Sequence, residues 1–424
     1  MSLVSEFIPK SWHCWREGYT RDLFLKDLIA GASVGVIALP LALAFAIASG
    51  VEPEKGLFTA IVAGFLISLL GGSQVQVSGP TGAFVVIVYG VIQKHGYEGL
   101  ALATLLAAGL LVIMGLLRCG KLLKYIPHSV ITGFTAGIAL VIATSQLKDF
   151  FGWQADKIPP GFIEKCQTYC QIAHTLNGWA LLLSGSTLLL VFLLRRTYPR
   201  WPGVMIAILL ATLSALLFEI PVETIESKFG AIPRVLPSPV LPTFSWELLQ
   251  RVWPDAIAIA LLGAIESLLS AVVGDRLAGT QHRSNIELIA QGIGNLGSIL
   301  FGGIPATGAI ARTTANVKMG GKTPMAGMVH AATLLFLMVA LAPMAGKIPL
   351  AALAGVLLFV AWNMSDLPEV SKVLQGHKSD AFVLLVTFVL TVLVDLIVAV
   401  QVGVLLAAAI FQLQKKGILT RQRL

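Results

Sequence analysis

The stretch LALATLLAAGLLVIMGLL (residues 100–117) is apolar on every face and decides the fold class of this 424-residue chain. A helix that crosses a bilayer needs about 20 apolar residues, whereas the strands of a membrane barrel alternate polar and apolar residues over about 10. The stretch therefore predicts a transmembrane helix and argues against an outer-membrane barrel.

The composition extends this prediction to the whole chain. Hydrophobic residues make up 56% of the sequence and charged residues 12%, against about 25% charged residues in ordinary soluble domains. The net charge is +8, but the basic residues are spread over the connections between apolar runs. Membrane orientation explains that distribution, so we predict an all-α polytopic protein in a lipid bilayer, with no nucleic-acid partner.

About fourteen apolar runs follow one another between residues 28 and 413. Acidic residues interrupt positions 1–27, which is not the pattern of a cleavable signal peptide. With a cytoplasmic N-terminus, the basic connections lie in the cytoplasm and the two longest polar loops, 151–177 and 220–253, lie outside, as the positive-inside rule requires. Both termini are then expected in the cytoplasm. A disulfide between Cys166 and Cys170 of the first loop stays open.

Two segments of the chain resemble each other. GGSQVQVSGPTGAF (71–84) and GGIPATGAI (302–310) each carry Gly-Gly and then a Pro close before Thr-Gly-Ala, and each precedes a run too short to cross a bilayer, 80–93 and 308–317. Seven spans per half would invert the second half relative to the first, as in many secondary transporters. We therefore expect two inverted repeats of seven segments, in which the third and tenth segments are half-helices.

The two motifs suggest an anion site. Gly79-Pro80 and Pro305 prevent a helix from continuing, so each short helix should begin near the bilayer midplane with free N–H groups. Two facing N-termini would bind an anion through these donors and the helix dipoles, and Thr81 and Thr307 could add hydroxyl donors. The alternative is that Pro and Gly only kink two packed helices.

Charged residues inside apolar runs give a second signal, because a charge at the bilayer centre costs at least about 2.5–3.5 kcal/mol. Glu266 lies in AIAIALLGAIESLLSAVVGD (256–275), and Ser270 lies one turn further on the same face. A carboxylate with a hydroxyl suits Na⁺ or reversible protonation. Arg312 either offsets Glu266 or raises the positive potential around an anion, and a structural ion pair is the alternative.

Four segments resemble the sulfate permease (SulP) family, the solute carrier twenty-six type of anion transporter: DLIAGASVGVIALPLALAFAIASG (27–50), VSGPTGAF (77–84), residues 264–332 and VLTVLVDLIVAVQVGV (389–404). The resemblance implies fourteen transmembrane segments in two inverted repeats of seven, with a moving core domain and a gate domain that forms a homodimer contact. The expected division is a cytoplasmic segment 1–27, core parts 28–126 and 254–346, gate parts 127–253 and 347–413, and a tail 414–424 in place of the STAS domain common in the family.

The chain is most similar to bacterial members such as the cyanobacterial sodium-dependent bicarbonate transporters. Carried over by motif, the anion would meet Thr81, Gly82 and Ala83 on one side and Gly308, Ala309, Ile310, Ala311 and Arg312 on the other, with Phe45 as a wall. Glu266 and Ser270 would form the cation site, where those relatives have Asp and Thr. The longer Glu leaves H⁺ as open as Na⁺, and no other cofactor is expected.

These features predict a secondary active transporter of bicarbonate, sulfate or a dicarboxylate, coupled to Na⁺ or H⁺ by an elevator-type motion in a bacterial cytoplasmic membrane. The alternatives are an uncoupled exchanger or channel of the same family and a nucleobase permease of the same fold. An enzyme is not expected, because the apolar runs hold no nucleophile–base pair and no His/Glu cluster.

Overall fold

The computed structural model describes residues 6–16, 18–121, 127–155, 158–159, 161–198 and 201–394, together with scattered residues between 398 and 409. The expected tail 414–424 and most of the last apolar run, 400–413, lie outside these residues. Contacts divide the chain into two units, Met1–Lys124 with Leu194–Pro349 and Tyr125–Leu193 with Leu350–Leu424. Residues 194–253, which the sequence analysis assigned to the gate domain, fall in the first unit.

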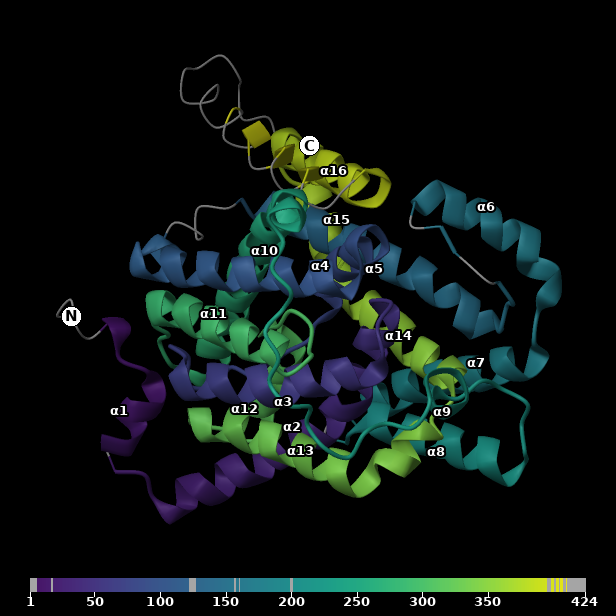
Figure 1. Ribbon diagram of the computed structural model, residues 1–424, viewed down its shortest axis with the longest axis horizontal. Coiled ribbons are helices and arrows are strands. Elements are labelled where there is room, and N and C mark those ends of the chain that lie inside the picture. Colours follow the sequence, from purple (N-terminus) through teal and green to yellow (C-terminus); the bar gives the residue numbers. More distant parts are fainter. Residues whose placement is uncertain are drawn as a thin grey trace. The chain divides into compact units, whose positions relative to one another are not determined.

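The first unit contains most of the long helices (Figure 1). It also contains the single strand pairing found in the described residues. Its elements are α1 (Lys10–Arg16), α2 (Arg21–Ala48), α3 (Pro53–Leu70), β1 (Ser78–Gly79), α4 (Gly82–Leu116), the 3₁₀ turn η2 (Cys119–Lys121), α8 (Gly203–Leu217), α9 (Ile225–Phe229), α10 (Trp246–Ala278), α11 (Ser284–Leu300), β2 (Thr307–Gly308), α12 (Ile310–Lys318) and α13 (Pro324–Gly346).

The second unit is built around α5 (His128–Phe151), against which α14 (Leu350–Ser365) and α16 (Lys378–Leu393) pack. Its other elements are α6 (Phe162–Ile172), the 3₁₀ turn η4 (Ala173–Thr175), α7 (Gly178–Thr197), which crosses the unit boundary, and α15 (Leu367–Leu374). Small residues permit close packing, since Gly133 lies against the backbone of Leu384 and Gly355 against the carbonyl of Ser184.

Eight stretches of the described chain are long and apolar enough to cross a membrane: residues 21–48, 53–70, 82–116, 128–151, 178–197, 246–278, 324–346 and 350–374. This agrees with a multi-pass membrane protein. The helix α4 covers most of two predicted apolar stretches, 80–93 and 100–117, and Gly96 interrupts it with a φ of 66°. Glycine adopts that left-handed conformation without a steric penalty, so the break falls at the residue that tolerates it best.

Helix α11 occupies a central place in the first unit. It packs against both α4 and α3, and Figure 1 shows it between them. Glycines permit these contacts: Gly292 of α11 lies against the carbonyl of Ala108, and Gly115 of α4 against that of Asn285. Without side chains at these points the helix backbones can approach closely, as is usual between membrane helices.

A buried carboxylate joins α2 to the start of α13. Asp27 is fully buried and accepts hydrogen bonds from the Lys322 and Thr323 N–H groups at 2.7 and 3.1 Å, and also from the Thr323 hydroxyl. The Tyr19 hydroxyl donates to it at 2.9 Å. Burial and this hydrogen bond raise the pKa of Tyr19, which keeps the phenol protonated as a donor.

Replacing this carboxylate should destabilise the first unit. Asp27→Ala leaves two backbone N–H groups without their acceptor, so we expect it to lower the free energy of unfolding by roughly 2–3 kcal/mol. Asp22→Ala, which removes an exposed carboxylate from the same helix, should change it by less than about 1 kcal/mol. Thermal unfolding of both purified variants in detergent measures the difference, and equal midpoints would contradict this role of Asp27.

Candidate functional site

The two related motifs lie side by side in the first unit. Strand β1 pairs antiparallel with β2, with Ser78 opposite Gly308 and Gly79 opposite Thr307. The pairing is extended by a hydrogen bond of 2.9 Å from the Ala309 N–H to the Val77 carbonyl. Helix α4 begins at Gly82 and α12 at Ile310, so both helices start directly beyond the same short strand pairing.

The N-termini of α4 and α12 are suited to bind a ligand. Neither N-cap residue, Thr81 or Ala309, uses its side chain to cap its helix. The N–H groups of a first helical turn have no partner within the helix, and the helix dipole places partial positive charge there. Gly82 and Ala83 are buried, whereas Ile310 and Ala311 are exposed. Phe45 is also buried, in α2.

Both motif threonines are anchored to α10. The Thr81 hydroxyl donates to Glu266 Oε2 at 2.9 Å, and the Thr307 hydroxyl donates to the Gly263 carbonyl at 3.0 Å. From the sequence alone, these hydroxyls are expected to donate to an anion. In the structure their protons point to α10 instead, so the donors left for an anion are backbone N–H groups.

The two residues expected at a cation site contact different elements. Glu266 is half-buried and bonds to Thr81, whereas Ser270 is fully buried and lies 3.0 Å from the Thr313 hydroxyl of α12. Thr313 in turn accepts a hydrogen bond of 3.1 Å from the Val77 N–H. The sequence does not single out Thr313, because a threonine in a short polar helix carries no distinguishing signal.

The atoms around Glu266 that could coordinate a cation are oxygens, namely those of its carboxylate and of nearby hydroxyls. Such ligands suit a hard cation such as Na⁺, and a carboxylate can equally bind a proton. Across the described part of the chain, no group of three or more His, Cys, Asp and Glu side chains could hold a metal ion.

Arg312 lies on the buried side of α12 and is 4% exposed. Among the described residues its two terminal nitrogens have no hydrogen-bond partner, and no ion pair joins it to Glu266. Its Nη1 fills the space beside Gly79, where an added Cβ atom would lie only 2.2 Å away. The geometry thus gives no support to the idea that Arg312 neutralises the charge of Glu266. The guanidinium is a buried positive charge close to the strand pairing.

Comparisons with known proteins agree with this architecture. The model of the Sulfate permease family matches residues 24–387. The "Putative sulfate transporter YvdB" of Bacillus subtilis is 46% identical over 93% of this chain and 75% of its own length, and the Bicarbonate transporter BicA of Picosynechococcus is 36% identical over 90% and 69%.

Two solved structures share the fold. The transmembrane domain of a cyanobacterial bicarbonate transporter BicA matches with a TM-score of 0.82 and 34% identity, over 90% of this chain and 98% of that domain. Murine Solute Carrier 26 family member A9 matches with a TM-score of 0.88 over 98% of this chain and 72% of that chain, but at 20% identity the likeness concerns the fold alone.

The contact between Gly79 and Arg312 gives a test of the site's geometry. Gly79→Ala would force the guanidinium to move and would place a side chain on a backbone with a φ of 157°, which L residues rarely adopt, and strain of this kind typically costs about 1–3 kcal/mol of stability. Gly90→Ala is the matched control, because an added Cβ there meets nothing within 4 Å and alanine favours the helix. We expect thermal unfolding to occur at a lower temperature in the first variant only. A Gly79→Ala protein as stable as the control would refute this close packing.

Proposed function

The chain belongs to the sulfate permease family, and from this premise we propose that it is a secondary transporter that moves a small anion across a bacterial cytoplasmic membrane together with Na⁺ or H⁺. The relatives are transporters by name, in keeping with the expectation that the chain is not an enzyme. The observation that carries the proposal is that α4 and α12 both begin next to one strand pairing, beside Glu266.

We place the anion at the two helix N-termini. Each contributes free N–H donors and the positive end of a dipole equivalent to about half a charge. Glycine and alanine at positions 82, 83 and 311 carry no large side chain that would cover the backbone N–H groups. The buried guanidinium of Arg312 adds positive potential, since no carboxylate pairs with it in the described part of the chain. Bicarbonate and sulfate, named for the relatives, and a dicarboxylate are the substrates to test.

We assign the coupling to Glu266. Its carboxylate contacts Thr81, the residue before the first turn of α4, so its charge state acts directly on the anion site. A bound cation or proton cancels a negative charge that would otherwise repel the anion. Binding linkage then requires that the anion strengthen cation binding by the same factor. Ser270 and Thr313 would support the same region from α10 and α12.

We propose that the transport step is a motion of one contact unit against the other. The anion-site residues all belong to the first unit, so the first unit can carry the site as one body while the second unit serves as the gate and the homodimer contact. Such rigid-body motion around a site at broken helices is typical of transporters with repeated halves. In this proposal α4 and α12 begin near the bilayer midplane, the fold has fourteen segments, and both termini lie in the cytoplasm.

Uptake into proteoliposomes tests the proposal directly. Labelled bicarbonate, sulfate and a dicarboxylate are offered separately, each with an inward Na⁺ gradient, an inward H⁺ gradient or none. We expect one gradient to drive accumulation of at least one anion. Downhill flux that ignores both gradients would instead identify an uncoupled exchanger or channel.

Neutralising the proposed coupling residue should separate accumulation from binding. Glu266→Gln keeps the size of the side chain but removes the charge, so we expect gradient-driven accumulation to fall at least about tenfold while the protein stays folded. Glu247→Gln, an exposed substitution near the start of the same helix, should accumulate the anion like the original protein. Accumulation retained in the Glu266 variant would rule out this coupling role.

A bulky side chain at the start of α4 should block the anion site. Thr81→Phe places a ring where the N–H donors lie, and we expect binding of every substrate to weaken by more than about a hundredfold. Thr81→Ser keeps the hydroxyl that bonds to Glu266 and should bind with nearly unchanged affinity. Equilibrium binding of labelled anion to the purified variants gives both values. If the phenylalanine variant binds normally, the anion does not bind at this helix terminus.

A further inference from the structure

Helix α11 carries a buried stripe of four polar side chains, which we call the α11 stripe: Glu287, Gln291, Asn295 and Ser298. Their spacing of four, four and three residues places them on one face of the helix. Each is no more than 1% exposed. Buried polar groups are costly unless they are hydrogen-bonded, and more so within a membrane, so the partners of this stripe show its purpose.

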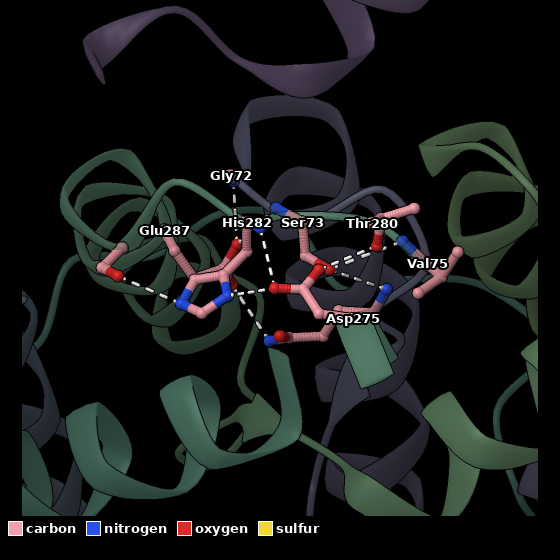
Figure 2. A network of polar contacts seen from close by, with 9 residues as sticks. Gly72, Ser73, Val75, Asp275, Thr280, His282 and Glu287 are labelled. Atoms are coloured by element: carbon pink, nitrogen blue, oxygen red, sulfur yellow. Dashed lines mark hydrogen bonds and ion pairs between the residues drawn. The ribbon is translucent and has the colours of Figure 1, made fainter. Parts of the chain in front are cut away.

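The first half of the stripe binds the segment that leads into β1. Glu287 Oε2 accepts hydrogen bonds from the Gly72 and Ser73 N–H groups at 2.8 and 3.2 Å, an approach that Figure 2 shows. Its Oε1 accepts from the side-chain amides of Gln76 and Gln291 at 3.0 and 2.9 Å. Glu287 thus fixes three residues of a segment without helical structure of its own.

The second half of the stripe binds the segment that leads into β2. Asn295 forms a two-point contact with Ala306, accepting from its N–H and donating to its carbonyl, each at 2.8 Å. Ser298 donates to the Ile304 carbonyl at 2.7 Å. The same helix therefore binds both the segment before β1 and the segment before β2. The two halves of the stripe meet near the middle of α11, where Gln291 and Asn295 lie four residues apart.

We propose that the α11 stripe sets the mutual register of the two helix N-termini, which makes its four members positioning residues for anion binding. The inference rests on the proposed function, in which those N-termini bind the anion. Two paired residues per strand are too few to define the pairing alone, and a slip by one residue would reverse every side chain. Donors that must converge on one anion tolerate only small displacements.

The test compares anion affinity with stability in purified full-length protein. Asn295→Leu removes the amide at similar volume, and Ser298→Ala removes one donor with little change in packing. The matched control is Thr104→Val, because Thr104 is fully buried in α4 but, among the described residues, its hydroxyl bonds only to the Leu100 carbonyl of its own helix. Equilibrium binding of labelled sulfate and labelled bicarbonate is measured for each variant beside its thermal unfolding.

We expect the dissociation constant to rise about tenfold in Asn295→Leu and about threefold in Ser298→Ala, and to stay unchanged in Thr104→Val even where its unfolding temperature falls. If Asn295→Leu does not fold, Ser298→Ala decides. Unchanged affinity in both stripe variants, while Thr81→Phe abolishes binding, would overturn the positioning role and leave the proposed function intact. Full binding by Thr81→Phe would instead overturn the proposed function and this inference with it.

Discussion

The antiparallel pairing of Ser78 and Gly79 with Gly308 and Thr307 is the constraint on which the rest of the first unit depends. A bilayer offers no water to hydrogen-bond exposed backbone groups, so a break in a membrane helix must find partners within the protein. Here two breaks satisfy each other, and further groups of both segments bond to α3, α10, α11 and α12. Two helix N-termini are thereby available in one place, which is the basis of the proposed anion site.

The buried charges of this unit differ in how completely they are bonded. Glu287 accepts four hydrogen bonds and Asp27 also accepts four, as expected of carboxylates that hold structure together. Glu266 accepts one from Thr81, and the terminal nitrogens of Arg312 have no partner in the described part of the chain. Glu266 and Arg312 both have spare bonding capacity and lie beside the strand pairing, where ligands would complete their coordination.

The sequence predicts the membrane class well, because long apolar runs are a local signal, and the paired Pro-Gly breaks single out the two segments that the structure pairs as β1 and β2. It identifies Glu266 for the same reason, as a charge inside an apolar run. It does not predict that Thr81 and Thr307 turn toward α10, since that choice depends on which partners the fold brings near. The sequence does not reveal the α11 stripe, because its polar residues are interspersed with glycine and aliphatic residues in one apolar run. The placement of residues 194–253 with the first unit likewise depends on tertiary contacts.

The central claim is that an anion at the two helix N-termini and a cation or proton at Glu266 strengthen each other's binding. The most direct measurement is the equilibrium affinity of the purified protein for labelled anion as Na⁺ concentration and pH are varied, together with cation affinity or proton uptake as anion is added. The account predicts that one cation raises anion affinity, that the anion raises affinity for that cation by the same factor, and that Glu266→Gln removes both effects. Anion affinity that responds to neither Na⁺ nor pH would contradict it.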